Sequence, residues 1–141
     1  MLDLSIIIIN YNTHSYTVAC IKSILEHTNN SINYDIRVVD NNSNNEDVEK
    51  LEAGIKILND RRIKLLKNYT NLGFGGGNML GCQFSKAKYY TFLNNDCLLL
   101  NDCFSILIDA MDSNKEFGIC GPQSYKENGE ILPTLDHYSS P

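Results

Sequence analysis

Three short polar segments, rich in asparagine and aspartate, each follow an apolar run of the sequence. They are Asn10-Tyr11-Asn12, Asp40-Asn41-Asn42-Ser43 and Asn94-Asn95-Asp96. Their amide and carboxylate groups can hydrogen-bond a polar ligand. In an open parallel sheet, ligands bind beyond the carboxyl ends of the strands, because the loops converge there. If the apolar runs are parallel strands, the three segments face one crevice.

A glycine cluster, Gly73-Phe74-Gly75-Gly76-Gly77-Asn78, is a second feature that could do chemistry. Backbone N–H groups of a glycine-rich loop at the start of a helix attract anions such as phosphate. The cluster does not match the dinucleotide fingerprint G-x-G-x-x-G, because its third glycine would fall on Asn78 and because the cluster follows the third apolar run rather than the first. A tight turn with a purely structural role is the alternative interpretation.

Apolar periodicity predicts the elements that must position these segments. The run Leu4-Ser5-Ile6-Ile7-Ile8-Ile9, with its consecutive β-branched isoleucines, is typical of a strand that is covered on both faces. Strands are expected over residues 4–9, 34–39, 62–67, 89–93 and 117–120. A first helix is expected around Val18, Ile21 and Leu25, with Ser15 as its cap, and a second from Val48 to Leu58, after the acidic residues Glu46 and Asp47. Two further helices are expected over 78–87 and over 104–111, and a flexible loop is expected at 73–77.

This alternation predicts an α/β fold with a mostly parallel sheet flanked by helices. Asn128-Gly129, between 123–125 and 131–132, predicts a β-hairpin with a type I′ turn, which ends the regular pattern. We therefore expect one domain over residues 1–132. Residues 133–141 form a polar tail that is loosely ordered or marks the point at which a longer chain was cut.

Composition places the chain among folded, water-soluble domains. Its 141 residues are 43% hydrophobic and 21% charged, and the net charge of -5 argues against a nucleic-acid partner. The apolar stretch 6–9 is too short to be a transmembrane segment or a signal peptide, so a cytoplasmic protein is expected. The cysteines are odd in number and contain no Cys-x-x-Cys pair, which favours reduced, mostly buried thiols: Cys20, Cys82, Cys97, Cys103 and Cys120.

Taken in order, four motifs resemble those of family 2 glycosyltransferases over about residues 4–132. They are Ile8-Ile9-Asn10-Tyr11-Asn12, Val38-Val39-Asp40-Asn41-Asn42-Ser43, Asn71-Leu72-Gly73-Phe74-Gly75-Gly76-Gly77-Asn78 and Leu93-Asn94-Asn95-Asp96. The resemblance implies a GT-A fold, a nucleotide-diphosphate sugar donor, a divalent cation (Mg²⁺ or Mn²⁺), and attack by an acceptor hydroxyl with inversion. The end Leu-Asn-Asn-Asp is similar to rhamnosyltransferase-like members that build surface polysaccharide, which implies an envelope glycan, a lipid-linked acceptor and work at the inner face of the membrane.

The resemblance also implies roles for the first two motifs. Asn10, Tyr11 and Asn12 stand where the family contacts the nucleotide base. Asp40 stands where a carboxylate holds the base or ribose, a task that suits a strong hydrogen-bond acceptor. The alternative for Asp40 is an Asx-turn that closes the strand.

Residues 94–96 occupy the place of the family's Asp-x-Asp motif, so Asp96 is the implied cation ligand. A hard oxygen ligand suits a cation that neutralises the diphosphate leaving group. Asn94 departs from the aspartate of many members; with Asn95 it can still bond a ribose hydroxyl, but it adds no charge. Asp96 as a plain turn cap is the alternative. In the third motif, Asn71, Gly73, Gly77 and Asn78 are implied to lie beside the donor.

A general base is the part that these motifs do not supply. An inverting transferase needs an Asp or Glu to take the acceptor proton, and the resemblance implies that it lies beyond residue 141; Asp136 is a poor candidate. A truncated chain or a second chain that supplies the base is therefore expected. The rival functions are a non-catalytic nucleotide-sugar-binding module and, on fold analogy alone, a nicotinamide dehydrogenase. His14, His27 and His137 share no ligand spacing and are interpreted as surface or capping residues.

Overall fold

A computed structural model describes residues 1–133 of the chain. Its internal contacts divide the chain into two compact units, Met1–Asp102 and Cys103–Pro141. All three polar segments belong to the first unit. Residues 134–141 of the predicted tail, with Asp136 and His137, lie outside the described residues.

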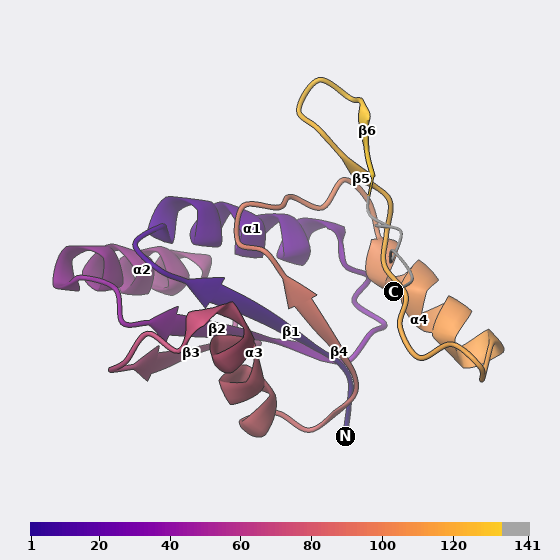
Figure 1. Cartoon of the computed structure of the whole chain (residues 1–141), viewed down its shortest axis with the longest axis horizontal. Coiled ribbons are helices and arrows are strands. Elements are labelled where there is room, and N and C mark those ends of the chain that lie inside the picture. Colours follow the sequence, from indigo (N-terminus) through magenta and orange to yellow (C-terminus); the bar gives the residue numbers. More distant parts are fainter. Residues whose placement is uncertain (134–141) are drawn as a thin grey trace, which may run out of the picture. The chain divides into compact units, whose positions relative to one another are not determined.

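The first unit is built on a parallel four-stranded sheet. Its strands are β1 (Leu2–Asn10), β2 (Tyr34–Asn41), β3 (Ile63–Asn68) and β4 (Ala87–Leu93), in the spatial order β3-β2-β1-β4 (Figure 1). The register pairs Asn10 with Asp40 and Ile8 with Leu93, so the strands end side by side. Ile6, Ile7 and Ile8 are fully buried, as expected for a central strand that is covered on both faces.

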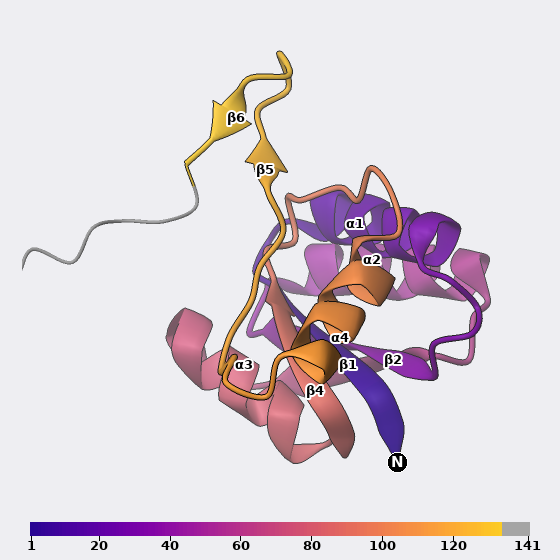
Figure 2. The ribbon, with the colours of Figure 1, turned by 90° about the vertical axis from the view of Figure 1, so that its right-hand side faces the viewer.

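Helices cover both faces of this sheet. Helices α1 (His14–His27) and α2 (Asn45–Leu58) pack together on one face, and α3 (Gly73–Gln83) lies on the other (Figures 1 and 2). The α1 stripe buries Cys20, Ile21 and Ile24. The expectation of an α/β fold with a mostly parallel sheet is confirmed.

The helix starts follow local chemistry. Asn44 caps α2, because its side-chain oxygen accepts a hydrogen bond from the Asp47 amide over 2.9 Å. Ser15 was the predicted cap of α1, but that helix begins one residue before it, at His14. The N-cap position belongs to Thr13, whose side chain makes no capping hydrogen bond.

The glycine cluster is helical, so the prediction of a flexible loop over 73–77 is wrong. Helix α3 begins at Gly73 and runs to Gln83. A Cβ on Gly77 would lie 2.9 Å from Ile9 Cδ1, and one on Gly81 would lie 2.6 Å from Ile7 Cγ2. These two glycines therefore let α3 approach the sheet closely, and this packing outweighs the low helix propensity of glycine.

The second unit contains α4 (Cys103–Ser113) and the hairpin of β5 (Ser124–Tyr125) and β6 (Ile131–Leu132). The predicted strand at 117–120 is wrong: the segment has no partner strand among the described residues, and Ile119 is 92% exposed. The hairpin is confirmed, but its type I′ turn is not. Only Gly129 of the pair has positive φ, at 82°, and its amide donates to Lys126 O, as in a three-residue loop.

Candidate functional site

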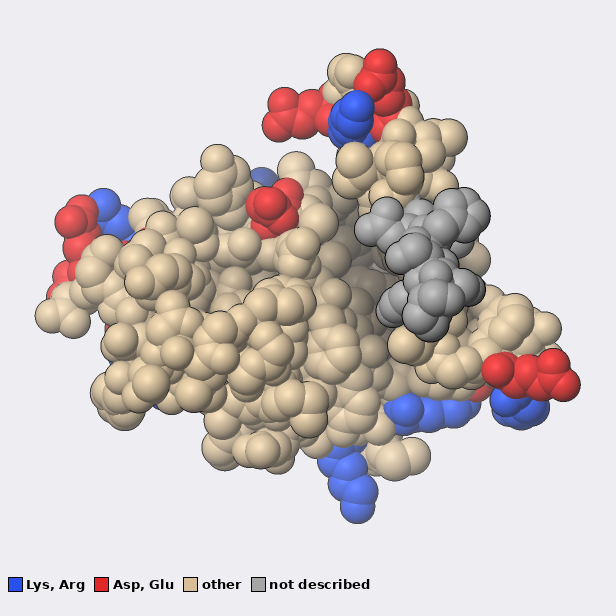
Figure 3. Space-filling view, in the orientation of Figure 1, with Lys and Arg blue, Asp and Glu red and all other residues tan. Residues whose placement is uncertain are grey.

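A cleft of about 380 Å³ lies at the carboxyl edge of the sheet. Five predicted site residues line it: Tyr11, Asn71, Gly73, Asn94 and Asn95. Four residues that were not among the predicted site residues complete the lining: Ile9, Thr13, Asn41 and Phe74. None of the nine side chains carries a charge. Helix α3 also has no charged residue, so it is tan in Figure 3. The lining of the cleft is therefore uncharged, with apolar surface beside its amide groups.

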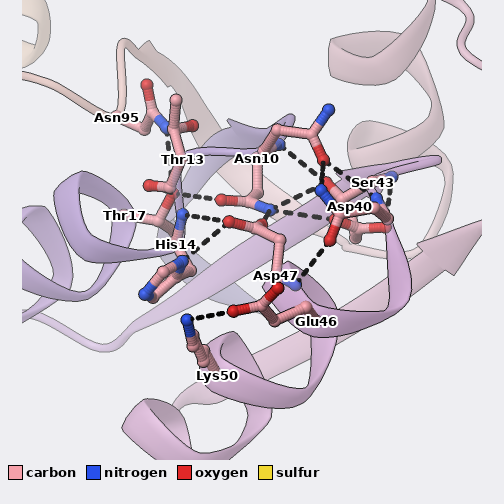
Figure 4. A network of polar contacts seen from close by, with 12 residues as sticks. Asn10, Thr13, His14, Thr17, Asp40, Ser43, Glu46, Asp47, Lys50 and Asn95 are labelled. Atoms are coloured by element: carbon pink, nitrogen blue, oxygen red, sulfur yellow. Dashed lines mark hydrogen bonds and ion pairs between the residues drawn. The ribbon is translucent and has the colours of Figure 1, made fainter.

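Asn10 lies behind the cleft rather than in it. Its side chain is fully buried, and its amide donates to Asp40 Oδ1 over 2.9 Å and to Asp47 Oδ2 over 2.8 Å (Figure 4). Its carbonyl oxygen accepts from the Thr17 hydroxyl over 2.7 Å. Every polar atom of the side chain is thus bonded to protein, so Asn10 acts by holding α1, β2 and α2 together.

Asp40 is also turned inward. It is 2% exposed, and its second carboxylate oxygen accepts from the Ser43 backbone amide over 3.2 Å. This contact reaches the amide three residues along the chain, one residue farther than in the Asx-turn that formed the alternative interpretation of Asp40, but it likewise ties the carboxylate to the loop after β2. The carboxylate therefore has a structural task in this conformation, with Asn10 as its neighbour across the strands.

Asn12 joins the first two polar segments. Its backbone has φ 53°, a left-handed conformation that asparagine tolerates, and its side-chain oxygen accepts from the backbone and side-chain amides of Asn44 over 2.9 and 2.8 Å. The Asn12 amide donates to Ser43 Oγ over 2.9 Å. Asn12 thereby fixes the loop that carries Tyr11, whose ring is exposed and lines the cleft.

Asp47, interpreted from the sequence only as a helix-dipole residue, is a buried member of this network. Its carboxylate accepts from Asn10, from the His14 backbone amide over 3.0 Å, and contacts His14 Nδ1 at 2.7 Å. Burial raises the pKa of Asp47, but the hydrogen bonds from Asn10 and His14 outweigh it and leave the pKa below its ordinary value. His14 is accordingly a partner of Asp47 and not an isolated surface residue.

Asn41 holds the start of α3. Its side-chain oxygen accepts from the Leu72 amide over 2.9 Å, and its amide donates to Asn71 Oδ1 and to Gly73 O over 2.9 and 3.1 Å. Gly73 has φ 68°, which glycine adopts without strain. The residue that links β2 to the α3 N-terminus is therefore Asn41, and Asn71 and Gly73 line the cleft as a result.

Gly77 and Asn78 were predicted to lie beside a ligand, but both are buried in α3 and neither lines the cleft. Gly77 faces Ile9, as its close approach to that side chain shows. Asn78 is 6% exposed, and its side-chain oxygen has no hydrogen-bond partner within residues 1–133. In this conformation the pair contributes to packing beneath the cleft.

The third polar segment forms a turn, in which the Cys97 amide donates to Asn94 O over 3.2 Å. Asn95 donates to Thr13 Oγ1 and Thr17 Oγ1 over 2.6 and 2.9 Å, which ties this turn to α1. Asp96 follows with an exposed carboxylate. Within residues 1–133, no three His, Cys, Asp or Glu side chains gather closely enough to form a metal centre by themselves.

Four residues that sequence reasoning did not assign to a site are therefore important here: Thr13, Thr17, Asn41 and Asp47. Asn41 lies inside a motif that was recognised, so its position was the available signal. Thr17 and Asp47 each stand directly before the first apolar residue of a helical stripe, Val18 and Val48. The stripes themselves gave no sign that these polar side chains would face inward.

No helix in the described part of the chain combines the length and the apolar character that crossing a membrane requires.

The chain is similar to known proteins in sequence and in fold. The chain is 29% identical over 133 residues to a protein of Rickettsia bellii (strain RML369-C) named as an uncharacterized glycosyltransferase; the match covers 94% of this chain and 18% of that protein. The fold resembles the crystal structure of S. aureus TarS 1-349, with a TM-score of 0.65 and 18% identity over 89% of this chain and 40% of the chain in that structure. The chain thus spans about a fifth of its curated relative.

The family model described as glycosyl transferase family 2 matches residues 5–138, which include the sheet except for the first residues of β1, the cleft and all three polar segments. This chain belongs to glycosyl transferase family 2.

Proposed function

We propose that the cleft binds a nucleotide-diphosphate sugar together with Mg²⁺ or Mn²⁺, and that the chain contributes the donor side of an inverting glycosyl transfer to an acceptor hydroxyl. Family membership supports glycosyl transfer in general. The single observation that carries the donor assignment is the gathering of Tyr11, Asn71 and Asn95 around one cleft at the carboxyl edge of a parallel sheet.

Each wall of the cleft offers a group that suits part of such a donor. The exposed Tyr11 ring gives a flat surface on which a base can stack, and the amides of Asn94 and Asn95 can bond sugar hydroxyls. The N-terminus of α3, held by Asn41, directs backbone N–H groups and the positive end of a helix dipole toward an anion. These contacts would place the diphosphate near Gly73.

The lack of charge in the cleft lining supports a requirement for a cation. A diphosphate in this cleft would meet no lysine or arginine among the nine lining residues. Asp96 has an exposed carboxylate next to Asn95, and Mg²⁺ in proteins is commonly held by one or two carboxylates, by water and by substrate phosphates. The residues present therefore fit a cation that arrives with the donor, and when bound it would neutralise charge on the diphosphate leaving group.

The wider context is part of the same proposal. We assign the acceptor side and the general base to residues outside the described part or to a second protein. We assign the reaction to the synthesis of polysaccharide or envelope glycan near the inner face of the membrane. A non-catalytic donor-binding module is the alternative. Sugar transfer or hydrolysis of the donor by this chain, lost in Asp96→Ala, would exclude the alternative.

A thermal-shift panel tests the proposal. Wild type and Asp96→Ala are titrated with UDP-, dTDP- and GDP-sugars, each with and without Mn²⁺. We expect one nucleotide to raise the melting temperature of the wild type only when Mn²⁺ is present, because a ligand that binds the folded state stabilises it according to its concentration over its Kd. If no nucleotide sugar shifts the wild type under either condition, the proposal is wrong.

A further inference from the structure

A chain of side-chain hydrogen bonds runs from two carboxylates in the interior to the rim of the cleft. It passes from Asp40 and Asp47 through Asn10 and Thr17 to Asn95 (Figure 4). Its donor and acceptor atoms lie 2.7 to 2.9 Å apart along this path. This path of hydrogen bonds connects the end of β1 to the turn that follows β4, two segments that lie more than eighty residues apart in the sequence.

The two carboxylates determine which group donates and which accepts in every hydrogen bond of this path. An ionised carboxylate only accepts hydrogen bonds, so Asn10 must present its NH₂ group to Asp40 and Asp47. The Asn10 carbonyl oxygen then faces Thr17, whose hydroxyl must donate to it. The other acceptor within reach of that hydroxyl, Thr13 O, is farther away, at 3.3 Å against 2.7 Å for Asn10 Oδ1.

The direction at Thr17 in turn determines the orientation of Asn95. Because the Thr17 hydroxyl hydrogen is used toward Asn10, the hydroxyl offers only lone pairs to Asn95. Asn95 therefore directs its NH₂ group at Thr17 and at Thr13 Oγ1. Its carbonyl oxygen has no protein partner among residues 1–133, and Asn95 lines the cleft.

We propose that Thr17 is a positioning residue that fixes the amide of Asn95 so that its carbonyl oxygen accepts a hydrogen bond from a hydroxyl of the nucleotide sugar. This inference rests on the proposed function for the identity of the ligand. Thr17 does not line the cleft and acts only through Asn95. The expected consequence is that loss of one buried hydroxyl on α1 weakens donor binding at the turn after β4.

A pair of substitutions at position 17 separates this role from simple packing. Thr17→Val removes the hydroxyl and keeps the branched shape, whereas Thr17→Ser keeps the hydroxyl and removes a methyl group. Ile21 is a fully buried apolar residue on the same helix, so Ile21→Val serves as a control for a variant that only loses stability. Thr13→Val removes the second acceptor of Asn95 at a position without a capping bond, and it keeps the test valid if Thr17→Val does not fold.

The first readout needs no ligand. In ¹H–¹⁵N spectra, the Asn95 side-chain NH₂ signals of the wild type should be distinct and slow to exchange with solvent. Thr17→Val and Thr13→Val should each shift these signals and speed their exchange, while Thr17→Ser and Ile21→Val should leave them unchanged. Asn95 signals in Thr17→Val that match the wild type would overturn the proposal.

The second readout is the affinity for UDP-, dTDP- and GDP-sugars with Mn²⁺, measured by calorimetry. For the nucleotide sugar that binds, Thr17→Val should weaken affinity about tenfold, as expected for one lost hydrogen bond, and Thr17→Ser should restore it to within about twofold. Equal affinity of wild type and Thr17→Val would contradict the positioning role. Failure of the wild type to bind any nucleotide sugar would instead overturn the proposed function, and the spectroscopic result would still decide whether Thr17 orients Asn95.

Discussion

Asn10 and Asp40 are register partners at the carboxyl ends of two neighbouring parallel strands, and the amide of Asn10 donates to the carboxylate of Asp40 over 2.9 Å. The same amide reaches Asp47 on α2. One buried side chain thus holds two carboxylates apart and bonds both of them. This arrangement gives the first prediction.

Asn10→Asp should destabilise the fold severely, because it replaces the shared donor with a third carboxylate beside Asp40 and Asp47. An uncompensated buried charge costs about 3–5 kcal/mol. Asn10→Ala, which adds no charge, should cost less, about 1–3 kcal/mol. Urea unfolding at pH 7 measures both. An Asn10→Asp protein as stable as Asn10→Ala would show that the two carboxylates do not depend on this donor.

Asp47 should make a visible contribution to the acid side of the stability curve. Its pKa is lower in the folded chain than the ordinary value of 3.8, so its stabilising effect is fully present above that value and is lost as the pH falls through the folded pKa. The stability difference between wild type and Asp47→Asn should therefore be largest near pH 7 and shrink below about pH 4. A difference that is constant from pH 7 to pH 2 would contradict the assigned contacts.

Ionisation of the Cys20 thiol should lower the free energy of unfolding at alkaline pH. Burial, followed by the nearby Cys97 and Asp96, raises the pKa of Cys20 from 9.0 to about 12. The unfolded chain therefore releases this proton first, and stability is expected to fall as the pH rises from about 9 toward 12. Cys20→Ala should flatten this part of the curve in urea unfolding. An unchanged slope in Cys20→Ala would count against the assignment.

The packing of α3 against the sheet gives a matched pair of glycine substitutions. Gly81→Ala would place a Cβ 2.6 Å from Ile7 Cγ2 and should cost about 1–3 kcal/mol through overpacking. Gly75→Ala meets nothing within 4 Å and should stabilise the helix by about 0.4–1 kcal/mol. Thermal unfolding of both variants checks this. Equal effects of the two would mean that α3 does not lie close to β1.

These results indicate what the sequence could and could not predict. The apolar run at Ile6–Ile9 predicted a central strand, and the four strands of the sheet followed from similar local patterns. Helix α3 was missed at its start, because its glycines favour a loop locally and are helical only through packing on Ile7 and Ile9, which lie more than sixty residues earlier.

The polar network was less predictable than the sheet for a similar reason. The two carboxylates that accept from the Asn10 amide are 30 and 37 residues away, so the sequence around Asn10 did not indicate whether its side chain faced a ligand or the interior. The motif correctly indicated the edge of the sheet at which it lies. Which amides face the cleft depends on hydrogen bonds between loops, as the contrast between Asn10 and Asn95 shows.

The most direct test of a donor site with a cation at Asp96 is paramagnetic broadening by Mn²⁺ in ¹H–¹⁵N spectra, recorded with UDP, dTDP or GDP. The predicted result is loss of the signals of Asn94, Asn95 and Asp96 with one nucleotide, a shift at Tyr11, and no effect at Arg61, which lies before β3 at the opposite end of the strands. Asp96→Asn should abolish the broadening. Broadening centred elsewhere, or unchanged by Asp96→Asn, would contradict the account.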